Sequence, residues 1–192
     1  LLGRSDITPV PELMAANIRG KEVLITGAGG SIGSELCRQA LSQNPTKIIL
    51  LESSEFAIYK INQELADLKN DKHPNVDIVP VIGSVQDPEL IDKVLEIFDV
   101  SSIFHAAAYK HVPMVELNII EAVKNNVFGT LTLANAANKF NVRHFTLIST
   151  DKAVRPTNFM GATKRIAEMI CQALDQVSLN TQFSIVRFGN VF

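Results

Sequence analysis

Short apolar runs alternate with longer stretches of helical periodicity from about residue 21 to the end of the chain. The apolar runs, rich in Val, Ile, Leu and Phe, predict six strands, at residues 22–26, 47–52, 76–82, 102–105, 144–149 and 183–188. Several are almost unbroken in apolar residues, which is typical of parallel strands buried on both faces. Helices are predicted between them, at residues 34–42, 55–69, 88–98, 116–140 and 159–179. The alternation predicts an α/β fold, a doubly wound parallel sheet with strand order 3-2-1-4-5-6.

The two ends of this pattern suggest the domain organisation. Residues 1–20 contain Pro9 and Pro11 and no strand pattern, so we expect a lead-in segment to one domain over residues 21–192. The chain stops at Asn190-Val191-Phe192, directly after the sixth predicted strand. A doubly wound domain is complete at that point. We therefore expect the substrate domain to be absent and the chain to be a fragment of a longer protein.

The composition narrows the class of protein. Apolar residues make up 46% of the 192 residues and charged residues 20%, a globular balance. A formal net charge of −2 provides no basic surface for nucleic acid, and no apolar run approaches the ~18 residues of a spanning helix, so we expect no membrane contact within this chain. Cys37 and Cys171 lie in helical stretches without a CxxC or clustered histidines. This argues against a metal site or a disulfide and for reduced thiols in the cytoplasm.

A glycine-rich segment, Thr26-Gly27-Ala28-Gly29-Gly30-Ser31-Ile32-Gly33, follows the first predicted strand. Its glycines at 27, 30 and 33 permit a tight turn, close approach of a pyrophosphate and close packing of helix on strand. The helix predicted to follow, at residues 34–42, would point its first amides and positive dipole end at the phosphates, and Ser31 and Ile32 are further candidate cofactor contacts. No Gly-Lys-Ser/Thr follows, which excludes the ATP/GTP-type loop. The segment predicts a Rossmann dinucleotide site, the alternative being an ordinary glycine-rich turn.

The ends of the next strands supply further candidate cofactor contacts. Glu52, followed by Ser53, ends the second strand about 20 residues beyond the loop, where a carboxylate accepts hydrogen bonds from ribose hydroxyls and repels a 2′-phosphate. This favours NAD over NADP, unless Glu52 is simply a solvated glutamate. Ser84 and Val85 follow the third strand, where the adenine edge would lie. Small residues follow the fourth strand and would let a cofactor pass, or pack the core: Ala106, Ala107 and Ala108.

A polar cluster, Ser149-Thr150-Asp151-Lys152, ends the fifth strand, where folds of this type place their ligands. Met160 and Lys164 begin the next helix and share one face at i, i+4 spacing, so that face should look back at the strand end. Without a precedent, the simpler interpretations are a polar turn at 149–152, a core methionine at 160 and a solvated lysine at 164.

These motifs together resemble the extended short-chain dehydrogenases/reductases. The resemblance rests on the glycine-rich loop, His105-Ala106-Ala107-Ala108, Asn126-Val127-Phe128-Gly129-Thr130, Ser149-Thr150-Asp151-Lys152, Lys164 and Arg187-Phe188-Gly189-Asn190. More narrowly, residues 108–113 (AYKHVP) and 149–158 (STDKAVRPTN) look like the polysaccharide-biosynthesis dehydratases that act on UDP-N-acetylglucosamine. The resemblance covers nearly the whole chain and implies a UDP-sugar substrate, NAD as cofactor and a role in bacterial surface polysaccharide or glycan synthesis.

One residue departs from the superfamily pattern. A tyrosine normally stands four residues before the lysine, and this chain has Met160, while Tyr59 and Tyr109 lack a lysine at +4. A thioether cannot transfer a proton at neutral pH. The large, membrane-associated branch of these dehydratases is similar in carrying Met here. Another group must then handle the proton of the sugar 4-hydroxyl.

The resemblance implies a 4,6-dehydratase, a lyase with an internal redox loop. C4 of the sugar is oxidised by hydride transfer to NAD⁺, water is eliminated across C5–C6, and the hydride returns to C6. In this scheme Lys152 is the C5 base and Asp151 the acid, with the reverse or a shared assignment open; the roles require a lowered pKa for Lys152 and a raised pKa for Asp151. Thr150 binds the 4-hydroxyl and relays its proton. Lys164 holds the nicotinamide ribose, Ser149 and Lys110 contact the cofactor, and Lys110 and Asn190 contact the substrate.

Leu1-Leu2-Gly3-Arg4 also resembles the linker that enters the catalytic domain of the large branch. This implies a parent protein anchored in the inner membrane by upstream segments, with this domain on the cytoplasmic side. We expect the parent to be a homo-oligomer and the isolated fragment to bind NAD but to turn over poorly or not at all.

Two alternatives stay open. A nucleotide-sugar 4-epimerase or reductase predicts Tyr at position 160 and usually lacks an acid–base pair at 151–152. A non-catalytic NAD-binding module would explain Met160 and the missing substrate domain.

Overall fold

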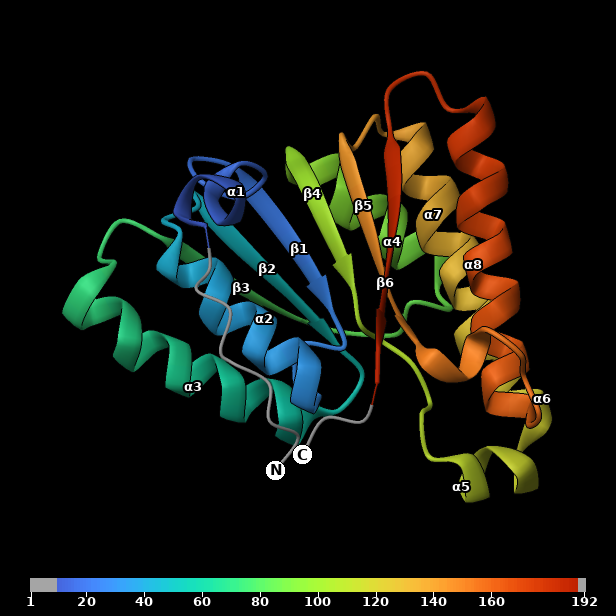
Figure 1. Cartoon of the computed structure of the whole chain (residues 1–192). Coiled ribbons are helices and arrows are strands. Elements are labelled where there is room, and N and C mark those ends of the chain that lie inside the picture. The colour runs from blue at the N-terminus through green and yellow to red at the C-terminus, as the bar shows by residue number, and fades with distance from the viewer. Residues whose placement is uncertain (1–9, 190–192) are drawn as a thin grey trace.

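The computed structural model describes residues 10–189 and contains a parallel six-stranded sheet in the order β3-β2-β1-β4-β5-β6 (Figure 1). The strands are β1 (Glu22–Thr26), β2 (Lys47–Glu52), β3 (Asp77–Ile82), β4 (Val100–His105), β5 (His144–Thr150) and β6 (Gln182–Phe188). The predicted fold class and strand order are confirmed, and each predicted strand lies within two residues of its observed ends. The order in which successive strands are added to the sheet reverses between β1 and β4, and folds of this class bind ligands at that point.

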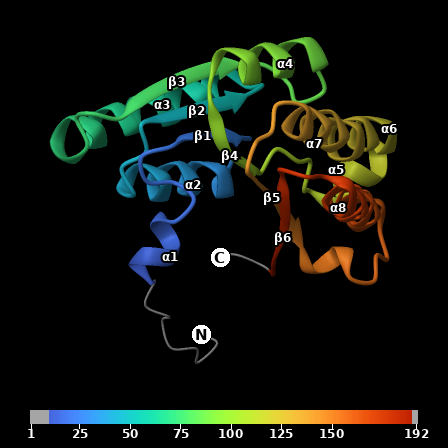
Figure 2. The ribbon, with the colours of Figure 1, turned by 90° about the horizontal axis from the view of Figure 1, so that it is seen from above.

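Helices cover both faces of the sheet (Figures 1 and 2). The pair α2 (Ser31–Ser42) and α3 (Glu55–Lys72) packs on one face, and α4 (Pro88–Ile97), α7 (Thr130–Lys139) and α8 (Phe159–Val177) pack on the other. The residues of β1 show how a central strand supplies both cores: Val23 and Ile25 join the apolar cluster under α2 and α3, while Leu24 joins the opposite one. Period-two alternation of this kind needs apolar side chains on both faces of the strand.

The single helix predicted over residues 116–140 is wrong. The structure has α5 (Val112–Leu117), α6 (Ile119–Val123), a π-helical segment over Lys124–Gly129 and then α7. Asn118 separates the first two helices because its backbone leaves the helical region, at φ −137° and ψ 50°. The π-helical segment inserts an extra residue, which lets two consecutive asparagines, Asn125 and Asn126, both lie buried.

The described part of the lead-in segment packs against the domain. It contains the short helix α1 (Pro11–Ala15), and Ala15 and Ile18 are buried. The backbone carbonyl of Asn17 accepts a 2.6 Å hydrogen bond from the Ser102 hydroxyl of β4. Within residues 10–189, no helix has both the length and the apolar character needed to cross a membrane.

Candidate active site

A hollow of about 220 Å³ opens at the carboxyl ends of β1, β2, β3 and β4. Nine predicted cofactor residues line it: Gly27, Gly30, Glu52, Ser53, Ser84, Val85, Ala106, Ala107 and Ala108. Four further lining residues were not predicted: Leu51, Gly83, Tyr109 and Asn125. Asn125 lies in the π-helical segment, which the helical periodicity of the sequence does not reveal.

The glycine-rich loop brings the start of α2 close to this hollow. A Cβ on Gly33 would overlap the carbonyl oxygen of Gly27, so the helix can approach the loop this closely only with glycine at 33. Gly30 precedes α2, and no side chain caps the first turn of that helix. The amides of Ser31, Ile32 and Gly33 are therefore available to an anion at the positive end of the helix.

Glu52 connects the end of β2 to the same loop. One carboxylate oxygen accepts the amide of Gly29 at 3.1 Å, and the other accepts the amide of Ser54 at 3.1 Å and the hydroxyl of Ser53 at 3.3 Å. The carboxylate is therefore held in place at the rim of the hollow rather than free in solvent. Lys110, after β4, also reaches the loop, with its Nζ 3.5 Å from the hydroxyl of Ser31.

The acid–base candidates lie at the end of β5. Thr150 ends the strand and Asp151–Ala153 form one turn of 3-10 helix. Asp151 Oδ1 accepts hydrogen bonds from Lys152 Nζ at 3.2 Å and from the Thr150 hydroxyl at 3.0 Å. These bonds lower the pKa of Asp151, which is the opposite of the raised pKa that an acid present from the start would need.

Helix α8 packs tightly on this turn. The side chain of Asn158 caps the helix by accepting the amide of Gly161 at 2.8 Å. A Cβ on Gly161 would overlap the carbonyl oxygen of Lys152, so a glycine here allows the helix to lie against the acid–base turn. The helix face that carries Met160 and Lys164 is thereby held beside the end of β5.

The interpretation of Lys164 as a solvated lysine is wrong. The residue is only 4% exposed, and burial lowers the pKa of its ammonium group to about 8. Its ammonium forms no hydrogen bond to any residue in the described range 10–189. Met160, also 4% exposed, packs in a small apolar cluster with Val115 and Ala122, as the core interpretation expected.

Sequence reasoning missed a buried polar network behind the hollow. His105, at the end of β4, has no solvent exposure and is hydrogen-bonded to the hydroxyls of Thr26 at 2.7 Å and Thr130 at 2.9 Å. Burial, together with the charge of Lys164, lowers the pKa of His105 to about 3, so its ring is neutral. Asn126 extends the polar interior by donating to Thr163 of α8 at 3.0 Å. In the sequence, His105 belongs to the motif with the alanines that follow it, and no role was predicted for it.

The other predicted site residues within the described range do not line the hollow: Ser31, Ile32, Gly33, Lys110, Ser149, Thr150, Asp151, Lys152, Met160 and Lys164. Ser149 lies buried under α8, where its hydroxyl donates to Glu168 at 2.7 Å. Asn190 lies outside the described residues. The β6 end that precedes it is near the acid–base turn, since a Cβ on Gly189 would lie 3.9 Å from Asp151 Oδ2.

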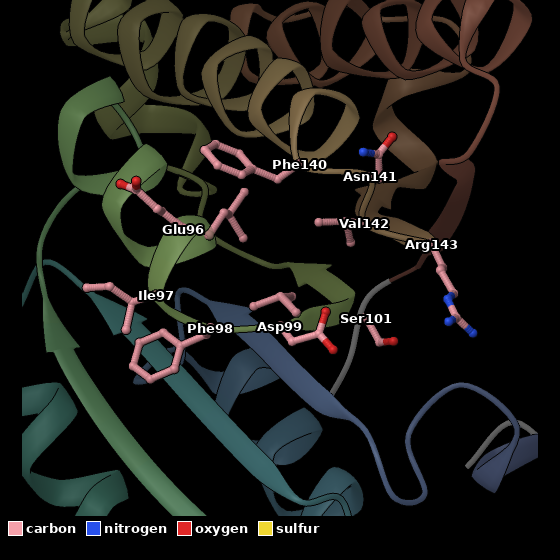
Figure 3. A pocket seen from close by; sticks show the side chains of 11 residues that line it. Glu96, Ile97, Phe98, Asp99, Ser101, Phe140, Asn141, Val142 and Arg143 are labelled. Atoms are coloured by element: carbon pink, nitrogen blue, oxygen red, sulfur yellow. The ribbon is translucent and has the colours of Figure 1, made fainter.

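A second hollow, of about 320 Å³, lies at the amino ends of β4 and β5 (Figure 3). It is formed by the segment from the end of α4 into β4 and by the segment between α7 and β5, with Phe98, Asp99, Phe140 and Arg143 among its walls. None of the predicted site residues lines it. No group of three or more His, Cys, Asp or Glu residues in the part of the chain that the structure describes is arranged to hold a metal ion.

Comparison with known proteins gives an independent result. Residues 23–192 match the family described as "Polysaccharide biosynthesis protein". The chain is 48% identical over 191 residues to the capsular polysaccharide biosynthesis protein CapD of Staphylococcus aureus, covering 100% of this chain and 31% of that protein. It is 34% identical over 175 residues to a UDP-N-acetylglucosamine 4,6-dehydratase (inverting) of Campylobacter jejuni, covering 90% of this chain and 49% of that protein.

Other relatives and solved structures share the fold. A UDP-glucose 4-epimerase of Rickettsia bellii is 32% identical over 173 residues, covering 89% of this chain and 49% of that protein. The dTDP-glucose 4,6-dehydratase DesIV of Streptomyces venezuelae, solved with NAD bound, superposes with a TM-score of 0.71 at 26% identity, covering 86% of this chain and 55% of that chain. The chain thus spans between about a third and about half of the length of these proteins.

Proposed function

The chain belongs to the polysaccharide biosynthesis protein family of extended short-chain dehydrogenases/reductases, and we propose that it is the NAD-binding part of a nucleotide-sugar 4,6-dehydratase acting on UDP-N-acetylglucosamine. The observation that carries the proposal is the hydrogen-bonded Thr150–Asp151–Lys152 group at the end of β5. An epimerase needs no separate acid and base for water elimination, whereas a dehydratase does.

The site fits NAD on features of this chain. The uncapped first turn of α2 suits the pyrophosphate, and the carboxylate of Glu52 suits the adenosine ribose and opposes a 2′-phosphate. The side chain of Lys164 is 4% exposed and no hydrogen bond from its ammonium is found within residues 10–189, so a ribose hydroxyl could accept one. When bound, NAD supplies the hydride acceptor at C4 and the hydride donor at C6.

The hydrogen bonds around Asp151 support a complete proton route. Thr150 accepts the proton of the sugar 4-hydroxyl and passes its own to Asp151, 3.0 Å away. Asp151 therefore begins ionised, as its lowered pKa requires, and becomes an acid only after the sugar is oxidised. It then donates this proton to the C6 oxygen, which leaves as water.

Lys152 completes the scheme as the base at C5. In this scheme Lys152 enters the cycle as the neutral amine, its ammonium proton having been released to solvent before the sugar is oxidised. Lys152 takes that proton and returns it to C5 after hydride reaches C6. Protons then balance: the 4-hydroxyl proton ends in water, and the C5 proton returns to C5. In this scheme Met160 packs the helix and takes no part in proton transfer.

The proposal also specifies the sugar substrate. Sequence identity alone does not separate the two activities, because the chain is 34% identical to a UDP-N-acetylglucosamine 4,6-dehydratase and 32% identical to a UDP-glucose 4-epimerase. Met160 and the Asp151–Lys152 pair favour the dehydratase. We place the whole protein in surface polysaccharide synthesis and expect this chain alone to bind NAD without efficient turnover.

The experiment is mass spectrometry of UDP-N-acetylglucosamine incubated with NAD⁺ and the full-length protein that contains this chain. Loss of the mass of one water without accumulation of NADH supports the dehydratase. An unchanged mass with an inverted C4 centre supports the epimerase instead. NAD binding with no product from a panel of nucleotide sugars supports a non-catalytic module.

A further inference from the structure

Glu168 is a fully buried carboxylate in the middle of α8. It accepts four hydrogen bonds: from the Ser149 hydroxyl at 2.7 Å, from Arg187 Nε at 2.8 Å and Nη2 at 2.7 Å, and from Arg165 Nη1 at 3.1 Å. Although burial alone would raise its pKa, the bonds from Arg187, Ser149 and Arg165 lower the pKa of Glu168 to about 2. Glu168 is therefore ionised, and its buried negative charge is paired with the guanidinium groups of Arg187 and Arg165.

These contacts join three parts of the candidate active site. Ser149 directly precedes Thr150 and Asp151 on β5. Arg187 pairs with Ser149 in the β5–β6 register and lies two residues before Gly189, which is next to Asp151. Glu168 itself lies one helical turn after Lys164 on α8. One carboxylate thus connects the acid–base turn, the end of β6 and the helix that carries Lys164.

We propose that Glu168 is a positioning residue of this site: it holds the acid–base turn in register with Lys164 and keeps a negative charge one turn from that lysine. The inference rests on the proposed dehydratase function, because the geometry it maintains is needed for proton transfer at the sugar. Glu168 touches no reacting atom, since it lies behind Ser149 on the face of β5 that α8 covers. A residue that only held the fold together would change stability without changing the turnover of folded molecules.

The primary test is Glu168→Gln in the full-length protein. The amide keeps the size of the side chain but loses its charge, and its NH₂ group faces the guanidinium of Arg187. We expect kcat per NAD-bound site to fall about tenfold or more, with KM for the UDP-sugar within about threefold of wild type, because displaced reacting groups cost rate more than binding. Counting sites by bound NAD removes the contribution of unfolded protein.

A double variant separates positioning from stability. Glu168→Gln alone leaves Arg187, whose side chain is 40% exposed, without its carboxylate partner, whereas Glu168→Gln with Arg187→Met removes both charges of the pair. We expect the double variant to regain most of the lost thermal stability and to keep the low kcat. Recovery of both stability and kcat would overturn the proposal.

A matched control exists on the other side of the sheet. Glu64 of α3 accepts Arg38 Nε and Nη2, as Glu168 accepts the same atoms of Arg187, and it lies outside the site. Glu64→Gln should change stability only. If wild type yields dehydrated sugar and Glu168→Gln has wild-type kcat, the inference fails; if wild type yields none, the proposed function fails instead.

A second readout needs no turnover. The charged and titratable groups that face Lys164 are Glu168 and Cys171 from α8 and the neutral His105 from β4. The Glu168 charge favours the ammonium form of Lys164, so its removal disfavours that form. The pH above which NAD affinity falls should therefore move down by about half a unit or more in Glu168→Gln. An unmoved pH profile would contradict the proposed link between Glu168 and Lys164.

Discussion

Lys164 combines two properties that are costly together: a cationic side chain and almost complete burial, with no hydrogen bond to its ammonium within residues 10–189. Desolvation disfavours the ammonium form, which explains the lowered pKa of about 8. A group of this kind is expected where a ligand completes its hydrogen bonds. The ammonium of Lys164 should therefore strengthen NAD binding and lower the stability of the NAD-free protein.

Lys164→Met should weaken NAD binding by about tenfold or more, because a hydrogen bond to a charged group is lost. It should also raise the melting temperature of the NAD-free protein, because a desolvated charge is replaced by an apolar side chain. In wild type the ammonium is present below pH 8 and is lost as the pH rises through that value, so affinity should fall above about pH 8. Titration calorimetry between pH 6 and 9.5 checks each of these effects.

The exposed Lys139 at the end of α7 provides the control. Lys139→Met should leave NAD affinity and its pH dependence unchanged. Equal affinities for Lys164→Met and wild type would show that the buried ammonium does not contact the cofactor.

Substitution of Met160 tests whether its side chain takes part in proton transfer. Its thioether packs with Val115 and Ala122, so Met160→Leu, which preserves volume, should keep kcat within about threefold and cost less than about 1.5 kcal/mol of stability. Steady-state kinetics and thermal unfolding measure the two quantities. A loss of more than about a hundredfold in kcat with normal stability would require a chemical role for the sulfur.

The contact between helix α8 and the acid–base turn depends on Gly161. Alanine is favoured over glycine in a helix by about 1 kcal/mol, so a free helix would gain stability from Gly161→Ala. Here the new Cβ would overlap the Lys152 carbonyl oxygen, which is backbone and cannot rotate away. We expect a net loss of melting temperature and at least a tenfold fall in kcat, measured on the folded, NAD-bound fraction. A variant more stable than wild type, with unchanged kcat, would show that α8 does not fix this turn.

The elements differ in how far the sequence predicts them. The strands were predictable because apolar runs of five or six residues bounded by polar residues admit few other structures. The region between β4 and β5 was not, because the helical periodicity of residues 116–140 continues through the break at Asn118 and through the π-helical turn. Asn125 lies within that π-helical turn, and its place at the hollow was therefore not predicted.

At the scale of the whole molecule, fold and cofactor hollow were largely predictable, and the electrostatics were not. The first βα turn and the strand ends fix the loop, Glu52 and the alanines by topology alone. The burial of Lys164, the neutral His105 and the paired Glu168 depend on which side chains meet in three dimensions. The lowered pKa of Asp151 depends on hydrogen bonds from the neighbouring Lys152 and Thr150, which the sequence does not reveal.

The central claim is a dehydratase in which the hydride removed from C4 returns to C6 of the same sugar. The most direct test incubates the full-length protein and NAD⁺ with UDP-N-acetylglucosamine deuterated at C4, and locates the label by mass spectrometry and NMR. We predict a product lighter by one water that retains deuterium, now at C6, and no such product from an Asp151→Asn, Lys152→Met double variant. A product of unchanged mass with deuterium still at C4, or a dehydrated product without the label, would contradict the claim.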